Sequence, residues 1–154
     1  MGELGDRRMA TGFRVTMLIA AAASVVALAP QYARAQDQQG FKMPSGNIFC
    51  VLEQGSDSSA VDMRCDINQM TDKGLPRPGG CPLSYGDAFV INATGAAIPL
   101  CHGDTVANPD LPPLAYGTVW RVNAFTCRSA TTGVTCSNAS GHGFTLSREA
   151  QKLF

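Results

Sequence analysis

Hydrophobic and polar residues alternate along several short stretches of this chain. The clearest stretch is VDMRCDI at 61–67, in which apolar residues take the odd positions and Asp62, Arg64 and Asp66 take the even ones. Alternation with a period of two is typical of a β-strand that buries one face and exposes the other to water. This stretch is therefore predicted to be a half-buried strand.

A second stretch, NIFCVLE at 47–53, precedes it, and the loop-forming run GSDSSA lies between them. The two stretches are predicted to form an antiparallel hairpin. Pairing Cys50 with Cys65 in this hairpin places Leu52 opposite Met63. Directly opposed residues of an antiparallel pair are close enough for a disulfide.

The same pattern recurs later in the chain. AFTCRS at 124–129 and GVTCSN at 133–138 flank a short turn, and pairing Cys127 with Cys136 places Ser129 opposite Val134. A third hairpin is predicted from DAFVI at 87–91, the turn NATG, and AAIPL at 96–100. Proline-rich runs at 73–82 and 108–117 separate the hairpins, because proline cannot donate to a sheet ladder.

Further strands are expected in YGTVWRV at 116–122 and GFTLS at 143–147. SREAQKLF at 147–154 is a possible short closing helix, with Ser147 as its N-cap. Together these elements predict an all-β fold of about six to eight short antiparallel strands. The expected architecture is a small disulfide-stapled barrel or sandwich.

The N-terminus has the composition of a secretory signal peptide. Arg7, Arg8 and Arg14 precede an apolar run at 15–29, and the small-residue motif Ala-Arg-Ala at 33–35 follows. The run has 15 residues, fewer than the roughly 20 that span a bilayer. We expect a signal peptide at 1–35 that is cleaved after Ala35, a flexible lead-in at 36–40 and a single β domain at 41–154. Translation can start at Met1 or at Met9, since residues 9–23 read as a tidier signal.

Removing residues 1–35 removes four arginines and two acids, which leaves eight basic and ten acidic residues and a net charge of −2. No basic stretch remains, so the sequence gives no electrostatic basis for nucleic-acid binding. The remaining surface is expected to be near neutral. No later stretch is apolar enough to be a membrane span.

All six cysteines lie after residue 35, and an even number in an exported chain of this size predicts a disulfide framework. The sequence contains no CxxC motif, which disfavours a redox pair or a zinc ribbon. Two bridges close the hairpins described above, and the third ties a loop back to a strand. The predicted pairs are Cys50–Cys65, Cys81–Cys101 and Cys127–Cys136.

Several motifs together resemble a family of small exported bacterial proteins of unknown function. They include FKMPSGNIFC at 41–50, LAYGTVW at 114–120 and GHGFTLSR at 141–148. The chain departs from the LPYG form of the second motif at Ala115. The resemblance implies a location in the bacterial envelope or outside the cell. It implies no activity, ligand or catalytic residue.

Possible chemistry centres on His102, Asp104 and His142. A histidine near a carboxylate can act as a general base, with a serine from PSGN or SNAS as nucleophile, although no GxSxG motif is present. Both histidines with Asp104 could also bind a metal if the fold brought them together. The structural interpretation is simpler: CHGDT is a turn, and the glycines on either side of His142 let the chain turn sharply before a strand.

The sequence therefore favours a non-enzymatic binding or inhibitor-like module of the bacterial envelope, acting in the periplasm or as a secreted protein. Its partner would be an unidentified protein or small ligand, and no cofactor, metal or catalytic residue is assigned. One alternative is a small hydrolase or metal-dependent enzyme, and another is a passive structural protein of the envelope. The candidate binding residues are His102, Asp104, Tyr116, Trp120 and His142.

Overall fold

The computed structural model describes residues 40–55, 60–71 and 75–154, all within the unit Arg34–Phe154. The predicted signal peptide at 1–35 and residues 36–39 of the predicted lead-in lie outside the described residues. Gly40, expected to end the lead-in, is instead the first residue of a strand. The described part of the chain contains no helix that could cross a membrane.

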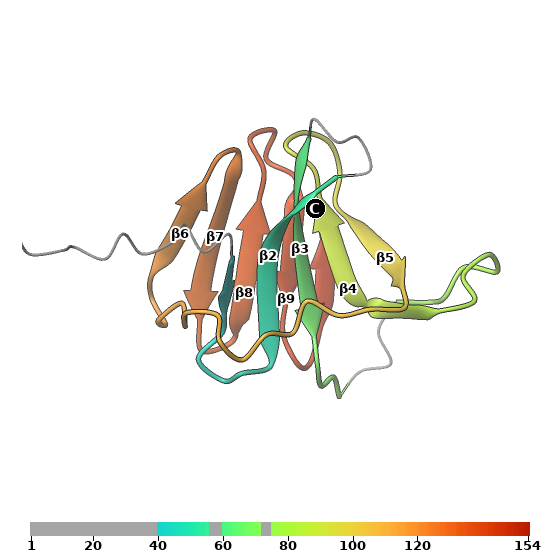
Figure 1. Ribbon diagram of the computed structural model, residues 1–154, viewed down its shortest axis with the longest axis horizontal. Coiled ribbons are helices and arrows are strands. Elements are labelled where there is room, and N and C mark those ends of the chain that lie inside the picture. The colour runs from blue at the N-terminus through green and yellow to red at the C-terminus, as the bar shows by residue number, and fades with distance from the viewer. Residues whose placement is uncertain (1–39, 56–59, 72–74) are drawn as a thin grey trace, which may run out of the picture. The chain divides into compact units, whose positions relative to one another are not determined.

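The described residues form two antiparallel five-stranded sheets, each with its strands in sequence order (Figure 1). The N-terminal sheet contains β1 (Gly40–Lys42), β2 (Ile48–Gln54), β3 (Val61–Ile67), β4 (Ser84–Ile91) and β5 (Ile98–His102). The C-terminal sheet contains β6 (Val119–Val122), β7 (Phe125–Ala130), β8 (Gly133–Ser137), β9 (Gly143–Leu146) and β10 (Gln151–Leu153). The all-β prediction is confirmed, and the arrangement is a sandwich.

The predicted hairpin registers are confirmed. In β2 and β3, Cys50 lies opposite Cys65, and in β7 and β8, Cys127 lies opposite Cys136. Both cross-strand bridges form, each with a Cα–Cα distance of 4.1 Å. The third pair, Cys81–Cys101, joins the segment before β4 to β5, as the sequence predicts.

The main core lies between the sheets, where apolar side chains from alternate positions of both sheets pack together. Phe41 of β1 contacts Trp120 of β6, with ring centroids 5.4 Å apart, and Phe89 of β4 contacts Phe144 of β9 at 6.0 Å. The largest side chains with almost no exposure come from both sheets: Phe41, Phe89, Phe125, Phe144, Met43, Met63, Ile91 and Leu146. Burial of this apolar surface is the main favourable term in folding.

The predicted C-terminal helix is wrong. Residues 151–153 form β10, which pairs with β9, and Lys152 lies opposite Thr145. Ser147 does accept hydrogen bonds from the backbone N–H groups of Glu149 and Ala150, at 3.1 and 3.0 Å. These bonds close a tight turn between two strands, so the capping chemistry is present but the chain then pairs with an open strand edge.

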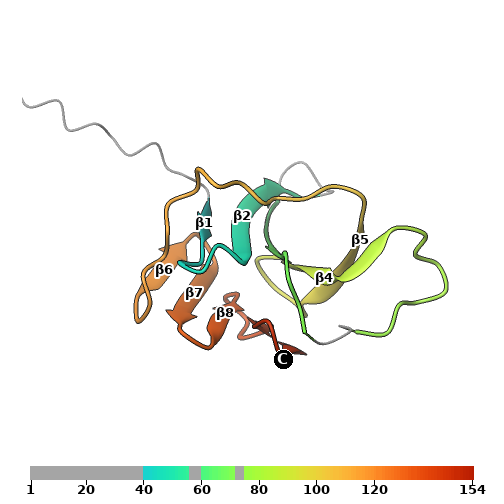
Figure 2. The ribbon, with the colours of Figure 1, turned by 90° about the horizontal axis from the view of Figure 1, so that it is seen from below.

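A second layer covers the outer face of the N-terminal sheet. Residues 103–114, which we call the strap, run from the end of β5 toward β1 and cross in front of β2 and β3 (Figures 1 and 2). At the far end, the backbone of Lys42 bonds Pro112 and Leu114, at 3.0 and 2.9 Å, and Leu111 is buried. No described segment covers the C-terminal sheet's outer face in this way.

Candidate functional site

Arg64, in the middle of β3, is the centre of a buried ionic cluster. Its guanidinium makes two parallel contacts with the carboxylate of Asp66, at 2.8 and 3.1 Å, and both residues are only 3% exposed. It also donates to the side chain and the backbone oxygen of Asp104 in the strap, at 3.1 and 3.2 Å. Bidentate pairs of this kind combine strength with a fixed geometry.

Asp66 holds the strap from the other side. Its Oδ2 atom accepts hydrogen bonds from the Thr105 hydroxyl at 3.1 Å and from the Val106 backbone N–H at 2.9 Å. The sequence prediction that the polar face of this strand meets water is therefore wrong at Arg64 and Asp66. A carboxylate and a guanidinium can be buried here because each satisfies the other and the strap supplies the remaining partners.

His102, at the end of β5, lies between two oxygen acceptors. Its Nδ1 atom is 2.6 Å from the backbone oxygen of Asp104, and its Nε2 atom is 2.9 Å from Oδ1 of Asp87 in β4. Because both neighbouring atoms are oxygens that accept hydrogen bonds, this geometry favours a proton on each ring nitrogen, as in the imidazolium form. Nη2 of Arg64, 3.3 Å from Nδ1, already donates to Asp66 and Asp104 and adds no hydrogen bond.

The pKa of His102 lies above its ordinary value for the same reason. Burial by itself lowers this pKa, but the hydrogen bond to Asp87 and the one to the Asp104 backbone raise it by more. The pKa of Asp104 is lowered, chiefly because its carboxylate accepts a hydrogen bond from Arg64. Glu53 also lies near the cluster, with its Oε1 atom 3.9 Å from Nη1 of Arg64, so Arg64 and His102 are surrounded by four carboxyl groups.

This cluster borders a hollow of about 410 Å³ whose lining includes Ser84, Asp87, His102 and Asp104. Ser84 lies opposite His102 across the β4–β5 ladder. However, the shortest contacts of both His102 nitrogens are to oxygens of Asp87 and Asp104, so no ring lone pair is available to take a proton from a serine hydroxyl. The geometry does not present His102 as a general base.

The structure does not bring His142 into this hollow. His142 is exposed in the turn between β8 and β9, and its backbone N–H donates to Oδ1 of Asn138 at 3.1 Å. The neighbouring glycines have different roles: Gly141 has φ of 82°, whereas a Cβ at Gly143 would lie 1.9 Å from the backbone oxygen of Cys136. The turn interpretation thus applies at Gly141, and the close approach of β8 and β9 requires the second glycine.

Asn138 organises this turn and connects the two sheets. Its Nδ2 atom donates to the backbone oxygens of Asn92 and Gly95, in the β4–β5 turn, at 3.0 and 2.7 Å. Its Oδ1 atom accepts from the backbone of Ser140 and His142, both at 3.1 Å. Asn138 is only 6% exposed. The serine-rich motif SNAS is therefore a structural joint and lies in a different place from His102.

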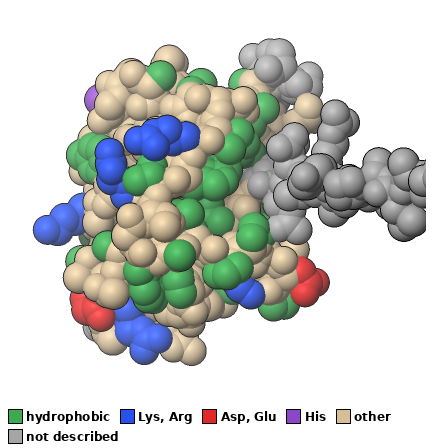
Figure 3. All heavy atoms as spheres, turned by 90° about the vertical axis from the view of Figure 1, so that its left-hand side faces the viewer, with side chains coloured by type: hydrophobic (Ala, Val, Ile, Leu, Met, Phe, Trp, Pro, Cys, Tyr) green, Lys and Arg blue, Asp and Glu red, His purple; other side chains and the backbone are tan. Residues whose placement is uncertain are grey.

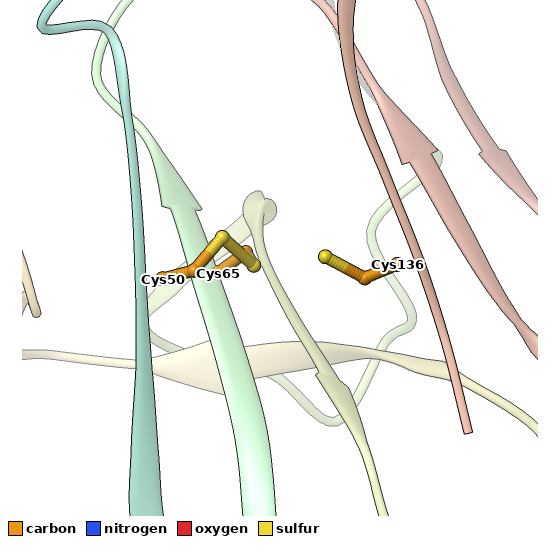
Figure 4. Close-up of side chains that lie close together, drawn as sticks. All are labelled: Cys50, Cys65 and Cys136. Atoms are coloured by element: carbon orange, nitrogen blue, oxygen red, sulfur yellow. A yellow bond between two sulfur atoms is a disulfide. The ribbon is translucent and has the colours of Figure 1, made fainter. Parts of the chain in front are cut away.

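Among the described residues, one group has metal-ligand atoms close together: Cys50, Cys65 and Cys136, whose sulfurs lie within 4.8 Å of one another. Figure 4 shows Cys136 pointing from the C-terminal sheet toward the Cys50–Cys65 bridge. All three sulfurs already belong to disulfides, so none is a thiolate ligand. The group is a contact between two bridges at the centre of the core.

A second hollow, of about 160 Å³, lies where turns of both sheets meet. We call it the Tyr116 hollow. Tyr116 is 41% exposed, and three other segments contribute: the β1–β2 turn, the β7–β8 turn and the residues after β9. Its polar lining includes Ser45, Asn47, Thr131, Thr132, Arg148 and Glu149.

Of the sequence-predicted binding residues, His102 and Asp104 share one hollow and Tyr116 lies in another. Trp120 is half-buried against Phe41 and belongs to the edge of the core. The sequence interpretation missed Arg64, Asp66, Asp87 and Asn138. A signal for the first two was present: they flank Cys65, whose bridge already placed them on a central strand.

A model of a family of unknown function, DUF6636, matches residues 21–154. No curated protein and no solved structure matches the chain. The three disulfides are consistent with an extracellular or secreted protein, because such bridges persist in oxidising compartments.

Proposed function

The chain belongs to DUF6636, a family of unknown function, and we propose that it acts as a non-enzymatic binding module exported to the bacterial envelope. The observation that carries this proposal is the Tyr116 hollow, which is open to solvent and built from four segments of a disulfide-braced sandwich. Rigid scaffolds with exposed polar loops are suited to recognition. Tyr116 offers an aromatic surface, and the groups around it offer donors and acceptors.

The enzyme alternative has less support. It requires an imidazole with a free lone pair, and both nitrogens of His102 already contact acceptor oxygens. It also requires His102, Asp104 and His142 to converge, but His142 is not among the residues that line the His102 hollow. His102 instead connects β4, β5 and the strap, which is a structural role.

Export is part of the proposal. The composition of residues 1–35 supports it, and so do the three bridges. N-terminal sequencing of the protein recovered from the periplasm or the medium should begin at Gln36. Recovery of the exported protein with residues 15–29 still attached would contradict cleavage after Ala35.

The binding role is tested by affinity capture from an envelope extract with the wild-type protein and two variants. Tyr116→Ala removes the aromatic group of the hollow, and Tyr85→Ala, in β4 outside the hollow, is the matched control. We expect a component that the wild-type protein and Tyr85→Ala retain and that Tyr116→Ala loses. Equal retention by all three proteins, or no retained component, would count against the hollow as a binding site.

A parallel assay addresses the enzyme alternative. The purified protein is incubated with ester, amide and glycoside substrates, alongside His102→Gln. We expect no turnover above a blank. Turnover that disappears in His102→Gln would overturn the binding-module proposal and restore the hydrolase hypothesis.

A further inference from the structure

The net charge predicted from the sequence is near neutral, but the basic and acidic residues are distributed unequally between the two sheets. Residues 114–154 contain four basic residues, Arg121, Arg128, Arg148 and Lys152, and one acid, Glu149. Residues 40–113 contain eight acids, Glu53, Asp57, Asp62, Asp66, Asp72, Asp87, Asp104 and Asp110, against Lys42, Arg64, Lys73 and Arg77. The C-terminal sheet is thus the basic half of the molecule.

Three of these bases lie on one face. The strand registers place Arg121 opposite Thr126, Arg128 opposite Thr135 and Lys152 opposite Thr145. Thr126, Arg128 and Thr145 each lie between two buried residues of their strand, and directly opposed residues face the same way, so the three bases share the outer face of the sheet. All three bases are exposed. We call this surface the basic face. In Figure 3 most of the visible Lys and Arg side chains lie toward the left-hand side of the view, and one lies toward the right.

The basic face is arranged in two rows across the sheet. One row runs from Arg128 through Thr135 and Thr145 to Lys152, so its two charges are three strand spacings apart, roughly 14 Å. Arg121 lies diagonally from Arg128, about 7–8 Å away by the geometry of paired strands. No acidic residue occupies either row. The charges therefore spread over an area instead of following a line.

The second row runs from Arg121 through Thr126, Ser137 and Gly143, and the apolar residue Phe154 ends it. Phe154 exchanges two backbone hydrogen bonds with Gly143, at 2.8 and 3.0 Å, so it continues the β9–β10 ladder beside Lys152. Two residues on from Lys152, it returns to the same face of the sheet. It is 49% exposed, and Leu153 is 37% exposed beside it.

We propose that the basic face, formed by Arg121, Arg128, Lys152 and Phe154, docks on the surface of an anionic lipid bilayer. A planar charged surface can meet all three bases at once, whereas a linear polyanion would follow one row. Headgroup phosphates are acceptors for the bases and the threonine hydroxyls. Phe154 can enter the interfacial region beside Lys152, for which a soluble polyanion offers no equivalent.

The proposal goes beyond the binding role of the Tyr116 hollow and does not depend on it. Each base near an anionic membrane surface should strengthen binding about fivefold, and salt should screen the attraction over about 10 Å. We therefore expect measurable but reversible binding that weakens as the ionic strength rises.

The test is sedimentation of the secreted protein with vesicles. One set contains phosphatidylcholine and phosphatidylglycerol in equal parts, and the other contains phosphatidylcholine alone. We expect binding to the anionic vesicles at low salt and little binding to the neutral ones. The variant Arg121→Gln/Arg128→Gln/Lys152→Gln should bind about a hundredfold more weakly. Its bases are exposed, so its thermal melt should match that of the wild-type protein.

Two pairs of single variants, each with one change on the basic face and one elsewhere, test whether vesicle binding depends on this face. Arg128→Gln should lose about fivefold, whereas Arg77→Gln, an exposed arginine between β3 and β4, should lose nothing. Phe154→Ser should weaken vesicle binding, whereas Leu83→Ser, also 49% exposed, should not.

Three outcomes would overturn the proposal. The first is equal binding to anionic and neutral vesicles. The second is a loss in Arg77→Gln as large as that in Arg128→Gln. The third is binding to soluble polyphosphate without binding to vesicles, which would identify a soluble polyanion as the partner of the face. Loss of ligand in Tyr116→Ala with unchanged vesicle binding would separate the two proposals.

Discussion

The two sheets of the sandwich share a plan and differ in what lies over them. Each has five antiparallel strands in sequence order and one disulfide across its central hairpin. The strap covers the outer face of the N-terminal sheet and buries Phe49, Asp66 and Ala88, which lie opposite one another in β2, β3 and β4. The corresponding face of the C-terminal sheet is exposed and basic.

Two arginines show how coverage by the strap changes the environment of a side chain. Arg64 in β3 and Arg128 in β7 both occupy polar positions of an alternating strand, next to a cysteine of a cross-strand bridge. Arg64 is 3% exposed and bound by carboxylates, whereas Arg128 is exposed. The local pattern is the same in both strands. The environment of each arginine is decided by whether a distant segment covers it.

The largest expected effect comes from breaking the ionic cluster. Arg64→Met should lower the free energy of unfolding by about 3–5 kcal/mol, because it leaves the buried Asp66 carboxylate without its cation. Arg128→Met, the matched change on the exposed face, should change it by less than about 0.5 kcal/mol. Chemical denaturation measures both.

A double variant sharpens this test. Arg64→Met/Asp66→Leu removes both charges and should recover part of the loss, since replacing a whole buried pair is far less costly than breaking it. Recovery should be incomplete because Thr105 and Val106 lose their acceptor. Equal losses in Arg64→Met and Arg128→Met would show that the strap does not change the environment of the sheet.

A smaller loss of stability is expected from changing Asn138, which connects the C-terminal sheet to the N-terminal sheet. Asn138→Ala removes both hydrogen bonds to the β4–β5 turn and the Oδ1 acceptor of the Ser140 and His142 backbone N–H groups. It should lower the free energy of unfolding by about 1–3 kcal/mol. His142→Ala, which truncates an exposed side chain of the same turn, is the control and should cost less than Asn138→Ala. If the two variants proved equally stable, Asn138 would not be the joint between the sheets.

The smallest expected effect is a dependence of stability on pH. The folded-state pKa of His102 is raised from 6.5, so its contribution is complete below pH 6.5 and is lost as the pH rises through the higher folded value. Melting temperature should therefore fall gently above pH 6.5 in the wild-type protein. His102→Gln should remove this slope.

Asp104 should give the opposite dependence, a loss of stability at acid pH. Its pKa is lowered from 3.8, so its contribution is present above that value and is lost as the pH falls through the lower folded one.

His142→Gln removes the other imidazole from an exposed turn and is the matched control for His102→Gln. A slope that disappears in His142→Gln but remains in His102→Gln would place the titration in the C-terminal sheet.

The sequence was sufficient for the features that depend on local pattern. Alternation and turn residues located β2, β3, β7 and β8, and the opposed cysteines set their registers. These contacts join residues 15 and 9 positions apart, so the pattern that predicts the strands also predicts their pairing. The C-terminal segment shows where such reasoning fails: a capping serine is compatible with a helix or a tight turn, and the open edge of β9 decided between them.

The candidate site depends on contacts that local pattern does not contain. Arg64 meets Asp104 across 40 positions, and Asn138 meets Asn92 across 46. No pattern near Arg64 in the sequence predicts that the strap covers this residue. The basic face was missed for a related reason: its bases lie on three strands and become neighbours only when the sheet forms, so a search for a basic stretch does not detect them.

The order of the disulfides bears on how the chain oxidises. Each cysteine is bonded to its nearest unpaired neighbour along the chain, at separations of 15, 20 and 9 residues. Six cysteines allow 15 pairings, and the native one is the pairing that forms if each second cysteine reacts on arrival with the one before it. Closing such short loops costs little chain entropy. A chain that emerges N-terminus first into an oxidising compartment would reach its native bridges without a round of disulfide exchange. The disulfides of the N-terminal sheet would then form before the C-terminal sheet had folded.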